Sequence, residues 1–212
     1  MSDSGKQFTT PQEEFWSGSF GDDYIGRNTE EGFLASNTAL FAKILSRTHG
    51  IKSVMEFGSN IGLNLRAIKT LLPNASQTAI EINAMACKKL QEKLPKTKIL
   101  NESILNIEIE QKVDLALIKG VLIHINPDAL QTVYQKLAQA ATRYVLIAEY
   151  YNPSPVTINY RGHEDRLFKR DFAGEFMDYQ RHFQLVDYGF VWHKDPNFPQ
   201  DDTTWFLMER TK

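Results

Sequence analysis

The stretch IKSVMEFGSNIGLNLRAIKTLLP, residues 51–73, joins a short apolar run, a glycine-bearing turn and a helical pattern. Residues 51–57 are typical of a buried strand, and residues 62–73 place apolar side chains at helical spacing before a proline ends the pattern. Gly58 and Gly62 suit a strand-to-helix turn in which a side chain would block a ligand or strain the backbone. The stretch therefore predicts a strand–turn–helix unit on which the fold is built.

The alternation of apolar runs with helical patterns continues to residue 150 and then changes. The predicted strands are 76–82, 96–101, 113–123 and 143–150, the predicted helices are 83–95, 126–140 and 171–180, and two β-like runs follow at 183–193 and 203–210. Such alternation implies parallel strands joined by right-handed helical crossovers. We therefore predict an α/β fold, a Rossmann-like doubly wound sheet of seven mostly parallel strands with an antiparallel edge hairpin and helices on both faces.

The 212 residues are expected to form one domain, 1–212, because this length is enough to bury a sizeable core. A hydrophobic fraction of 42% and a charged fraction of 24% are ordinary for a soluble globular protein. Within the domain we expect N-terminal cap helices at 1–48, a core at 50–150, a lid at 151–180 and a terminal strand pair at 181–212.

The charge and cysteine content limit the partners and the compartment. A formal net charge of −2 and a pI near 6.2 argue against nucleic acid or an anionic membrane as partner. The N-terminal residues lack the apolar core of a signal peptide and no apolar run is long enough for a membrane span, so a cytoplasmic location is expected. The single cysteine, Cys87, cannot form an internal disulfide and is expected to be a small buried apolar side chain. The sequence carries no signal for an oligomeric state.

Two acidic residues accompany the glycine turn. Glu81 lies near the end of the second predicted strand, nineteen positions after Gly62, and a carboxylate at this edge of a parallel sheet can accept both hydroxyls of a ribose. Glu56 lies inside the first strand, where a buried carboxylate needs either turn amides or a ligand ammonium group as partner. The turn has Asn60 where G-x-G-x-x-G requires glycine, which argues against a dinucleotide, and no Gly-Lys-Ser/Thr follows for a P-loop.

The segments VMEFGSNIG, AIEIN, LNESIL and DLALIKGVLIHI resemble, in this order, the motifs of class I S-adenosylmethionine-dependent methyltransferases. The resemblance implies S-adenosyl-L-methionine as cofactor, with the glycine turn around its methionine part, Glu81 on the ribose, and Ser103 and Ile104 beside the adenine. The backbone near Lys119 would line the amino-acid end. The implied cofactor-binding residues are Glu56, Gly58, Ser59, Asn60, Gly62, Glu81, Ile82, Ser103, Ile104, Lys119 and Gly120.

A likeness over nearly the whole chain points to one group of these enzymes. FWSGSFGDDYIGRN, KGVLIHINP, YNPSP, YRGHEDRLFKRDFAGE and DYGFVWHKDPNFPQDDTTWFL are similar to segments of the methylases associated with pseudaminic acid biosynthesis. This likeness implies N- or O-methylation of a small polar, anionic acceptor, namely a nonulosonic-acid-type sugar or its precursor. The alternatives are another small acceptor such as an amino acid, a non-methyl transfer from the same cofactor, an RNA or protein methyltransferase, a non-catalytic binding module, and a nicotinamide-dependent oxidoreductase.

The stretch NYRGHEDRLFKRDF, residues 159–172, concentrates cationic side chains just after the fifth strand. It could be a solvated, partly helical surface with internal ion pairs, as most charge runs are. Its position at the carboxyl edge and the glycine at 162 favour a lid over the acceptor, whose arginines would make bidentate contacts. The predicted substrate-binding residues are Arg27, Asn28, Asn152, Arg161, Arg166 and Arg170.

The candidate catalytic residues are His124, His163, Tyr150 and Tyr151. Either histidine could accept a proton from the acceptor near neutral pH, and the tyrosines could orient it. His124 could equally be structural, and Glu149 could be a core, solvent-exposed or functional carboxylate. The aromatic residues Phe15, Trp16, Phe20 and Tyr24 are expected to pack, with a stacking box as the alternative. Asp195, Asp201 and Asp202 lack ordered ligand spacing, so a solvated loop and no metal are expected.

Overall fold

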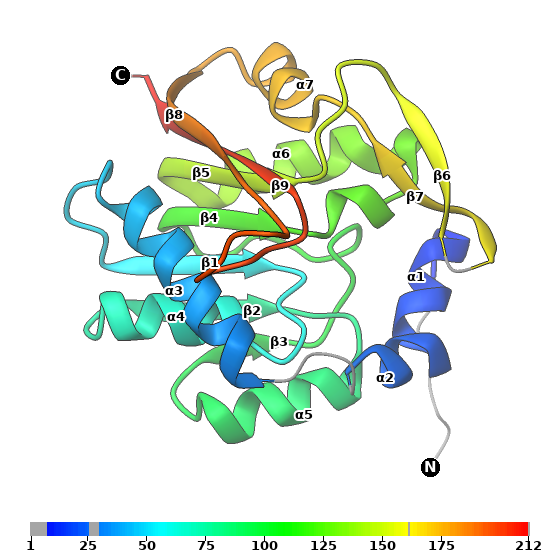
Figure 1. Ribbon diagram of the computed structural model, residues 1–212, viewed down its shortest axis with the longest axis horizontal. Coiled ribbons are helices and arrows are strands. Elements are labelled where there is room, and N and C mark those ends of the chain that lie inside the picture. Colours follow the sequence, from blue (N-terminus) through cyan, green and yellow to red (C-terminus); the bar gives the residue numbers. More distant parts are fainter. Residues whose placement is uncertain (1–7, 26–29, 161, 212) are drawn as a thin grey trace.

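The computed structural model describes residues 8–25, 30–160 and 162–211 of the chain. Its central feature is a seven-stranded sheet with the strand order β3-β2-β1-β4-β5-β9-β8 (Figure 1). The strands are β1 (Ser53–Phe57), β2 (Ser76–Ile80), β3 (Lys98–Leu100), β4 (Val113–Lys119), β5 (Ala141–Glu149), β8 (Phe183–Val191) and β9 (Thr203–Arg210). The first five strands pair in parallel, and β9 pairs antiparallel with both β5 and β8. The predicted fold is thereby confirmed.

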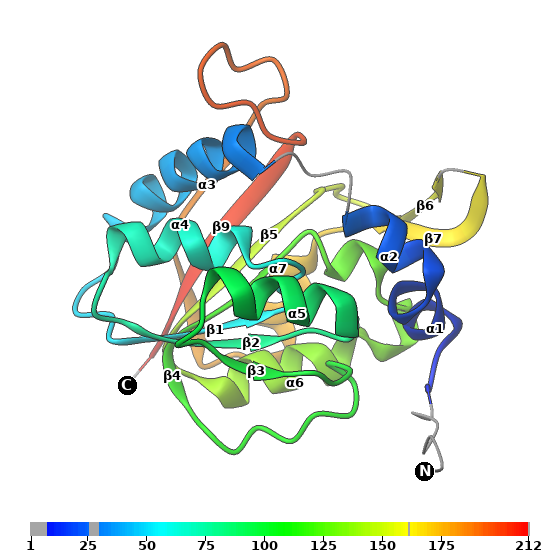
Figure 2. The same ribbon diagram turned by 90° about the horizontal axis from the view of Figure 1, so that it is seen from below.

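Helices cover both faces of this sheet (Figures 1 and 2). One face carries α3 (Glu30–Leu45), α4 (Leu63–Leu71) and α5 (Ala84–Lys93), and the other carries α6 (Leu130–Ala140) and α7 (Phe172–Tyr179). Leu115 and Leu117 of β4 pack toward the first face, whereas Ala116 and Ile118 pack toward the second. This alternation of burial follows the two-residue period of a strand and gives the sheet two separate cores. None of the described helices is long and apolar enough to cross a membrane.

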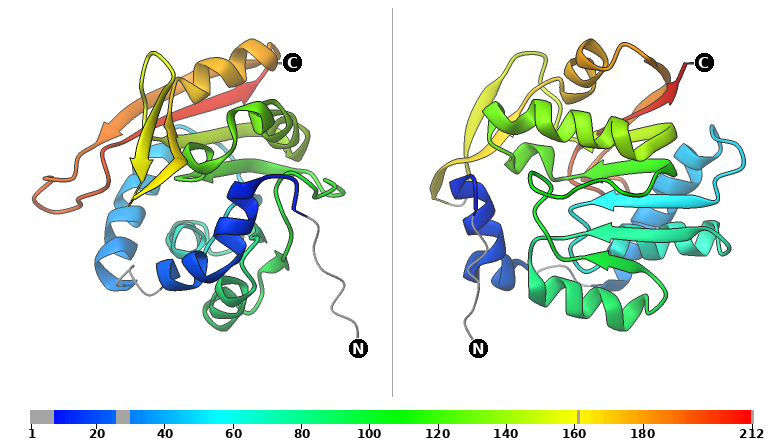
Figure 3. Two further views of the ribbon diagram at one scale, coloured as in Figure 1. Left: turned by 90° about the vertical axis from the view of Figure 1, so that its right-hand side faces the viewer. Right: turned by 180° about the vertical axis from the view of Figure 1, so that it is seen from behind.

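The carboxyl edge of the sheet is covered by two additional units (Figure 3). One is a pair of short helices, α1 (Pro11–Ser17) and α2 (Ser19–Ile25), and the other is an antiparallel two-stranded sheet, β6 (Val156–Tyr160) and β7 (His163–Lys169). The interpretation of 159–172 as a partly helical surface is therefore wrong, because most of it is strand. The chain turns between the two strands at Gly162, whose φ of 84° lies in the left-handed region that glycine adopts without strain.

The strand predicted at 113–123 is shorter than expected. It ends at Lys119, and the chain continues into two single-turn 3-10 helices, η1 (Leu122–His124) and η2 (Pro127–Ala129). Gly120, with a φ of 68°, turns the chain away from the sheet, so the apolar residues that follow pack as a short helix. Asn126 caps η2 through its side chain, which accepts the Asp128 amide, as its sequence position before a proline suggests.

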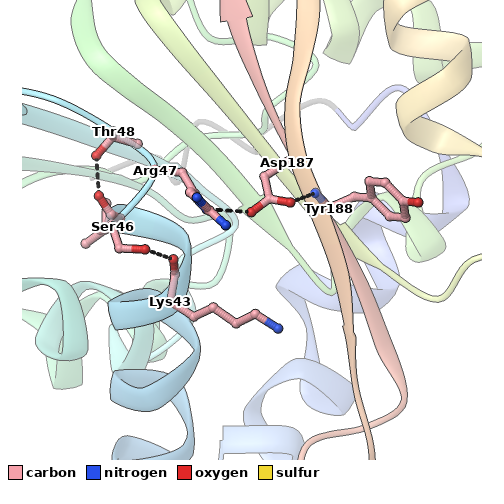
Figure 4. Close-up of polar contacts among 7 residues, drawn as sticks. Lys43, Ser46, Arg47, Thr48, Asp187 and Tyr188 are labelled. Atoms are coloured by element: carbon pink, nitrogen blue, oxygen red, sulfur yellow. Dashed lines mark hydrogen bonds and ion pairs between the residues drawn. The ribbon is translucent and has the colours of Figure 1, made fainter.

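The end of α3 is tied to the outer strand β8 at the surface (Figure 4). The Arg47 guanidinium lies 3.0 Å from an Asp187 carboxylate oxygen, and the other Asp187 oxygen accepts the Tyr188 amide at 2.9 Å. The hydroxyls of Ser46 and Thr48 donate to carbonyls of the last helical turn, which closes the helix before β1. The Arg47 side chain is 63% exposed, so water competes with this ion pair.

We expect Arg47→Ala to lower the free energy of unfolding by less than about 1 kcal/mol, because exposed ion pairs contribute little. Trp205→Ala, in the core between β9 and α3, should cost roughly 3–5 kcal/mol through the cavity it leaves. Urea denaturation followed by circular dichroism measures both. A loss in Arg47→Ala comparable to that in Trp205→Ala would show that the surface tie is a main support of the fold.

Candidate active site

The glycine turn after β1 is built from three residues in the left-handed region. The φ angles of Gly58, Asn60 and Gly62 are 76°, 45° and 81°. A Cβ on Gly58 would lie 2.5 Å from Val121 Cγ2, and one on Gly62 would lie 2.8 Å from Leu90 Cγ. The two glycines are therefore required by the backbone conformation and by packing against β4's turn and α5, which supports the strain argument made from the sequence.

Glu81 fastens this turn to the end of β2. One carboxylate oxygen accepts the Asn60 amide at 2.7 Å, and the other accepts the Asn83 amide at 2.8 Å. The side chain is buried, and burial raises its pKa while these backbone hydrogen bonds act in the opposite direction. Each oxygen of an ionised carboxylate can accept a further hydrogen bond. Glu81 can therefore still accept ligand hydroxyls.

A cavity of about 260 Å³ opens at the carboxyl edge, beside this turn and under the α1–α2 cap. Its position at β1 and β4 is the point where the strand order reverses, which is where open parallel sheets bind ligands. Nine of the predicted cofactor-binding residues line it: Gly58, Ser59, Asn60, Glu81, Ile82, Ser103, Ile104, Lys119 and Gly120. Glu56 and Gly62 lie behind the wall, where Glu56 is fully buried and Gly62 begins α4.

Glu56 is held by a residue that the sequence did not suggest. Asn64 Nδ2 donates to Glu56 Oε1 at 2.6 Å, whereas the amides of Gly58 and Ser59 donate to the Ile80 carbonyl. Turn amides as partners of Glu56 are therefore excluded, while a ligand ammonium remains a prediction. Complete burial raises the pKa of Glu56 to about 8. Lys119 lies near enough to attract this carboxyl electrostatically, and burial lowers the pKa of Lys119.

Glu149, at the end of β5, shapes the turn that carries His124. One carboxylate oxygen accepts the amides of Val121 and Leu122, each at 2.9 Å, and so holds the start of η1. The side chain is 3% exposed, and burial raises its pKa to about 7. Glu149 is therefore a buried carboxylate and not a solvent-exposed one, and it positions the turn that carries His124.

His124 lines the cavity in a fixed orientation. Its Nδ1 lies 2.6 Å from the Arg166 carbonyl oxygen, which can only accept, so Nδ1 carries the proton of a neutral ring and Nε2 carries a lone pair. Burial lowers the pKa of His124 to about 4. The ring therefore stays neutral at physiological pH. Its centroid lies 4.6 Å from that of Trp16 and 5.1 Å from that of Tyr160.

The N-terminal aromatic residues divide into two groups. Trp16 and Tyr24 line the cavity and make an edge-to-face contact at 5.3 Å, whereas Phe15 and Phe20 stack on each other at 4.0 Å outside the cavity lining. Phe15 and Phe20 therefore pack against each other, as expected from the sequence. Trp16 and Tyr24 instead form an aromatic wall of the cavity. A wall of this kind excludes water and can stack on a flat ligand group.

The N-terminal cap docks on the core through polar contacts that the sequence analysis missed. The Ser103 hydroxyl donates to Glu13 of α1, and the Asn83 side-chain amide donates to Asp22 of α2 at 2.8 Å. Glu13 also closes a capping box with Thr10. The pattern T-P-Q-E at 10–13 is the signal that could have identified this helix start and its acidic residue.

The predicted acceptor-binding residues lie in several places. Tyr150 lines the cavity, whereas Tyr151 is 43% exposed and does not. Arg170 pairs with Glu175 at 2.6 Å and Arg166 lies over the Phe15 ring at 5.3 Å, so neither guanidinium lines the cavity. Asn152 donates to the Ser154 carbonyl within its own loop. Arg27, Asn28, Arg161 and the side chain of His163 lie outside the described part of the chain.

The acidic loop before β9 contributes to the cavity, contrary to its interpretation as solvated only. Asp201 and the preceding Gln200 line the cavity. Asp195 and Asp202 do fit a surface loop, because Asp195 accepts amides of its own turn and Asp202 accepts from His193 at 2.8 Å. Over the ranges that the structure describes, no group of three or more His, Cys, Asp or Glu side chains is arranged to hold a metal ion.

The strand order and a cavity at the reversal point define the class of open α/β proteins that bind nucleotide-like ligands. Within that class, residues 55–143 match the family model described as a methyltransferase domain. The match confirms the predicted enzyme class, a methyltransferase. The predicted cofactor, S-adenosylmethionine, is the one bound in the structure of the Synechocystis enzyme described below. A search of curated protein sequences found no match.

Several solved structures share the fold over most of the chain. A 1,6-didemethyltoxoflavin-N1-methyltransferase from Burkholderia thailandensis has 17% identity and a TM-score of 0.68, covering 98% of this chain and 93% of that one. A magnesium protoporphyrin IX methyltransferase from Synechocystis PCC 6803 has 12% identity and a TM-score of 0.65, covering 97% and 100%. A methyltransferase from Clostridium acetobutylicum ATCC 824 has 11% identity and a TM-score of 0.65, covering 91% and 98%. At these identities the likeness concerns the fold.

Glu149→Gln tests the buried carboxylate through its pH dependence. Burial raises the folded-state pKa above the unfolded value of 4.5, so the stability from this group is complete below pH 4.5 and is lost as the pH rises through 7. Glutamine can still accept amides but does not ionise. We expect the variant to gain on the order of 2–3 kcal/mol relative to wild type between pH 5 and pH 8.5, measured by urea denaturation.

Glu149→Ala is the companion variant, since it removes the acceptor at every pH. It should lose on the order of 2 kcal/mol at pH 5, because two amides lose their partner. A wild type and a Glu149→Gln variant with parallel pH dependences would contradict the assignment.

Proposed function

We propose that the chain transfers the methyl group of S-adenosylmethionine to a nitrogen or oxygen atom of a small polar acceptor, a nonulosonic-acid-type sugar or its precursor being the leading candidate. The observation that carries the proposal is the shared cavity. It brings the cofactor-binding turn with Glu81 and a neutral histidine, His124, into one enclosed space at the carboxyl edge. A donor and an acceptor can therefore meet there with little water.

The residues present fit the cofactor by the chemistry of their polar atoms. Among the described buried atoms, Glu56 Oε2, Asn60 Oδ1 and Asn64 Oδ1 have no protein partner, and all three belong to the turn region. Oxygen acceptors of this kind suit the ammonium group of the methionine part. Glu81 would hold the ribose hydroxyls, and Ile82 with Ile104 would contact the adenine. The Ser103 hydroxyl is engaged with Glu13, so it would support this wall through α1.

S-adenosylmethionine supplies an activated methyl group on a positively charged sulfur. The chain's own contribution is positioning and proton transfer. His124 Nε2, left as the acceptor by the Nδ1–H donation to the Arg166 carbonyl, would accept a hydrogen bond and a proton from the acceptor group. Burial raises the pKa of Tyr150, so its hydroxyl stays protonated and can donate to an acceptor oxygen. We take His124 as the proton acceptor, since the side chain of His163 lies outside the described part of the chain.

The acceptor side of the cavity is polar and supports a small, hydroxyl-rich ligand. Gln200 and Asp201 line the cavity from the loop before β9. The Gln200 side-chain amide donates a hydrogen bond to Asn37 Oδ1 at 2.9 Å. Solved structures similar to this chain include, by their names, methyltransferases of 1,6-didemethyltoxoflavin and of magnesium protoporphyrin IX. Another small acceptor such as an amino acid remains the alternative. The net charge of −2 and the pairing of Arg170 with Glu175 argue against RNA.

Glu81→Ala should weaken binding of S-adenosylhomocysteine on the order of ten- to a hundredfold, because hydrogen bonds to a charged group are lost and the turn is released. Isothermal titration calorimetry measures the affinity, and circular dichroism shows whether the variant is folded. Asp187→Ala, which removes an exposed carboxylate of β8, is the matched control and should bind as wild type. Equal affinities for a folded Glu81→Ala and the wild type would remove Glu81 from the cofactor site.

His124→Phe should reduce methyl transfer about a hundredfold or more while binding S-adenosylhomocysteine normally, because the ring shape stays and the proton acceptor is lost. Transfer of labelled methyl groups into a fractionated cell extract, with the product identified by mass, measures the activity. Tyr179→Phe, at an exposed tyrosine of α7 that does not line the cavity, is the control.

A second prediction concerns the pKa of His124. The His124 imidazole should titrate near pH 4 instead of near 6.5, so the ring keeps its lone pair above about pH 5. An NMR titration, with the signal assigned by its loss in His124→Phe, tests this. A midpoint near 6.5 would mean that the ring is open to water and not the fixed neutral acceptor.

A further inference from the structure

The charged side chains that line the cavity are mostly acidic. Glu13, Glu81 and Asp201 contribute carboxyl groups, and Lys119 is the one lysine or arginine that lines the cavity among the described residues. Burial lowers the pKa of Lys119, so its ammonium is held less firmly than that of a lysine in water. The imidazole of His124 stays neutral at physiological pH, because burial lowers its pKa. A lining of this kind attracts a cation more than an anion.

Aromatic rings gather around His124 in the same cavity. Trp16 of α1 and Tyr160 of β6 both contact the imidazole, with ring centroids 4.6 and 5.1 Å from its own. Tyr24 of α2 lies edge-to-face with Trp16 at 5.3 Å, and Tyr150 at the end of β5 also lines the cavity. Figure 3 shows α1 and α2 beside the hairpin of β6 and β7, so these rings come together from segments far apart in the sequence.

Tyr150 connects these rings with a carboxylate. Asp201, Tyr24 and Tyr160 each act electrostatically on the Tyr150 hydroxyl, so the four groups lie close together. Asp201 is exposed and therefore lies at the rim of the cavity, and it forms no ion pair with any described residue. Aromatic rings grouped in this way recognise organic ammonium groups, and a nearby carboxylate adds to the attraction.

We propose that this aromatic enclosure, formed by Trp16, Tyr24, Tyr150 and Tyr160 with Asp201 at its rim, binds an aliphatic ammonium group, and that the methylated atom is its nitrogen. The inference rests on the proposed function and narrows it, because that function leaves nitrogen and oxygen open. Ring faces stabilise a cation near their centroids and give no comparable stabilisation to a neutral hydroxyl. The enclosure thus selects a positive charge at the reacting end of the acceptor, where the family resemblance implied a negative one.

The amine must lose one proton before it reacts. A like charge nearby lowers the pKa of an ammonium group, so a bound sulfonium makes this proton easier to lose. The proton goes to His124 Nε2, which carries the lone pair. The nitrogen lone pair then forms the new N–C bond as the C–S bond breaks, and the electron pair of that bond stays on sulfur, which becomes a neutral thioether. The product is a methylated ammonium group.

Binding of cyclohexylamine and cyclohexanol to protein saturated with S-adenosylhomocysteine tests the enclosure. The two probes share one ring, but at neutral pH the amine is positively charged and the alcohol is not. In a ligand-observed NMR titration we expect wild type to bind the amine about tenfold more tightly than the alcohol. Tyr160→Leu should weaken binding of the amine about fivefold and leave that of the alcohol unchanged. Tyr188→Leu, at an exposed tyrosine of β8 that does not line the cavity, is the matched control and should bind both as wild type.

The methylated atom is tested by blocking the amines of the cell extract that serves as the source of acceptor. N-hydroxysuccinimidyl acetate acetylates amines, and hydroxylamine then removes acetyl groups from any hydroxyl esters. Labelled methyl transfer should be lost in the treated extract and should return when untreated extract is added back.

The inference is overturned if the treated extract still accepts the methyl group, or if wild type binds the alcohol as tightly as the amine. A Tyr160→Leu variant that weakens both probes equally would overturn it as well, because the ring would then act through shape and not through charge. No transfer into the untreated extract, or no binding of S-adenosylhomocysteine, would instead count against the proposed function itself.

Discussion

The hydrogen bond from the Asn60 amide to Glu81 is the contact on which the site depends. It joins the turn after β1 to the end of β2, the strand with which β1 pairs in parallel. Asn60 adopts a φ of 45°, a conformation that costs a non-glycine residue free energy. Such a conformation persists where other contacts of the residue offset the cost. The hydrogen bond from the Asn60 amide to the buried Glu81 carboxylate is such a contact. The same group that would bind the cofactor thus also holds the turn in the shape that leaves space for it.

The floor of the cavity rests on a cluster of buried ionisable groups, of which Lys119 lines the cavity and Glu56 and Glu149 lie behind it. Glu56 and Glu149 both carry raised pKa values, and Lys119, which attracts both electrostatically, carries a lowered one. Each of the three is less easily charged than in water, because desolvation outweighs their mutual attraction. A cofactor that brings its own ammonium and carboxylate groups would complete this charge arrangement. The floor is therefore better suited to a zwitterionic ligand than to a neutral one.

The sequence predicted the fold and most of the residues that line the cavity beside the glycine turn, because both follow from short-range patterns. Strand and helix periods, and two glycines and an acid at fixed spacing, determine where Gly58 and Glu81 lie. The rest of the cavity lining depends on contacts between distant segments, which no local pattern reports. Asp201 reaches the cavity from a loop that composition describes only as a turn. Asn64 takes the place that turn amides were expected to fill beside Glu56, because those amides are used by β2.

The cationic segment at 159–172 was predicted to bind the acceptor through its arginine side chains. The structure shows that the segment contacts the cavity residue His124 through its backbone instead. Its hairpin does lie at the cavity, but the described guanidinium groups serve the fold: Arg170 pairs with Glu175, which also accepts the Tyr134 hydroxyl. The contact from this segment to His124 is made by a backbone carbonyl, that of Arg166, which fixes the tautomer of the ring. A carbonyl at this position requires a strand held in register, and the anchored arginine helps to hold it. If His124 is the proton acceptor, this segment would act on the reaction through the position of its backbone, because the Arg166 carbonyl of β7 sets the tautomer of His124.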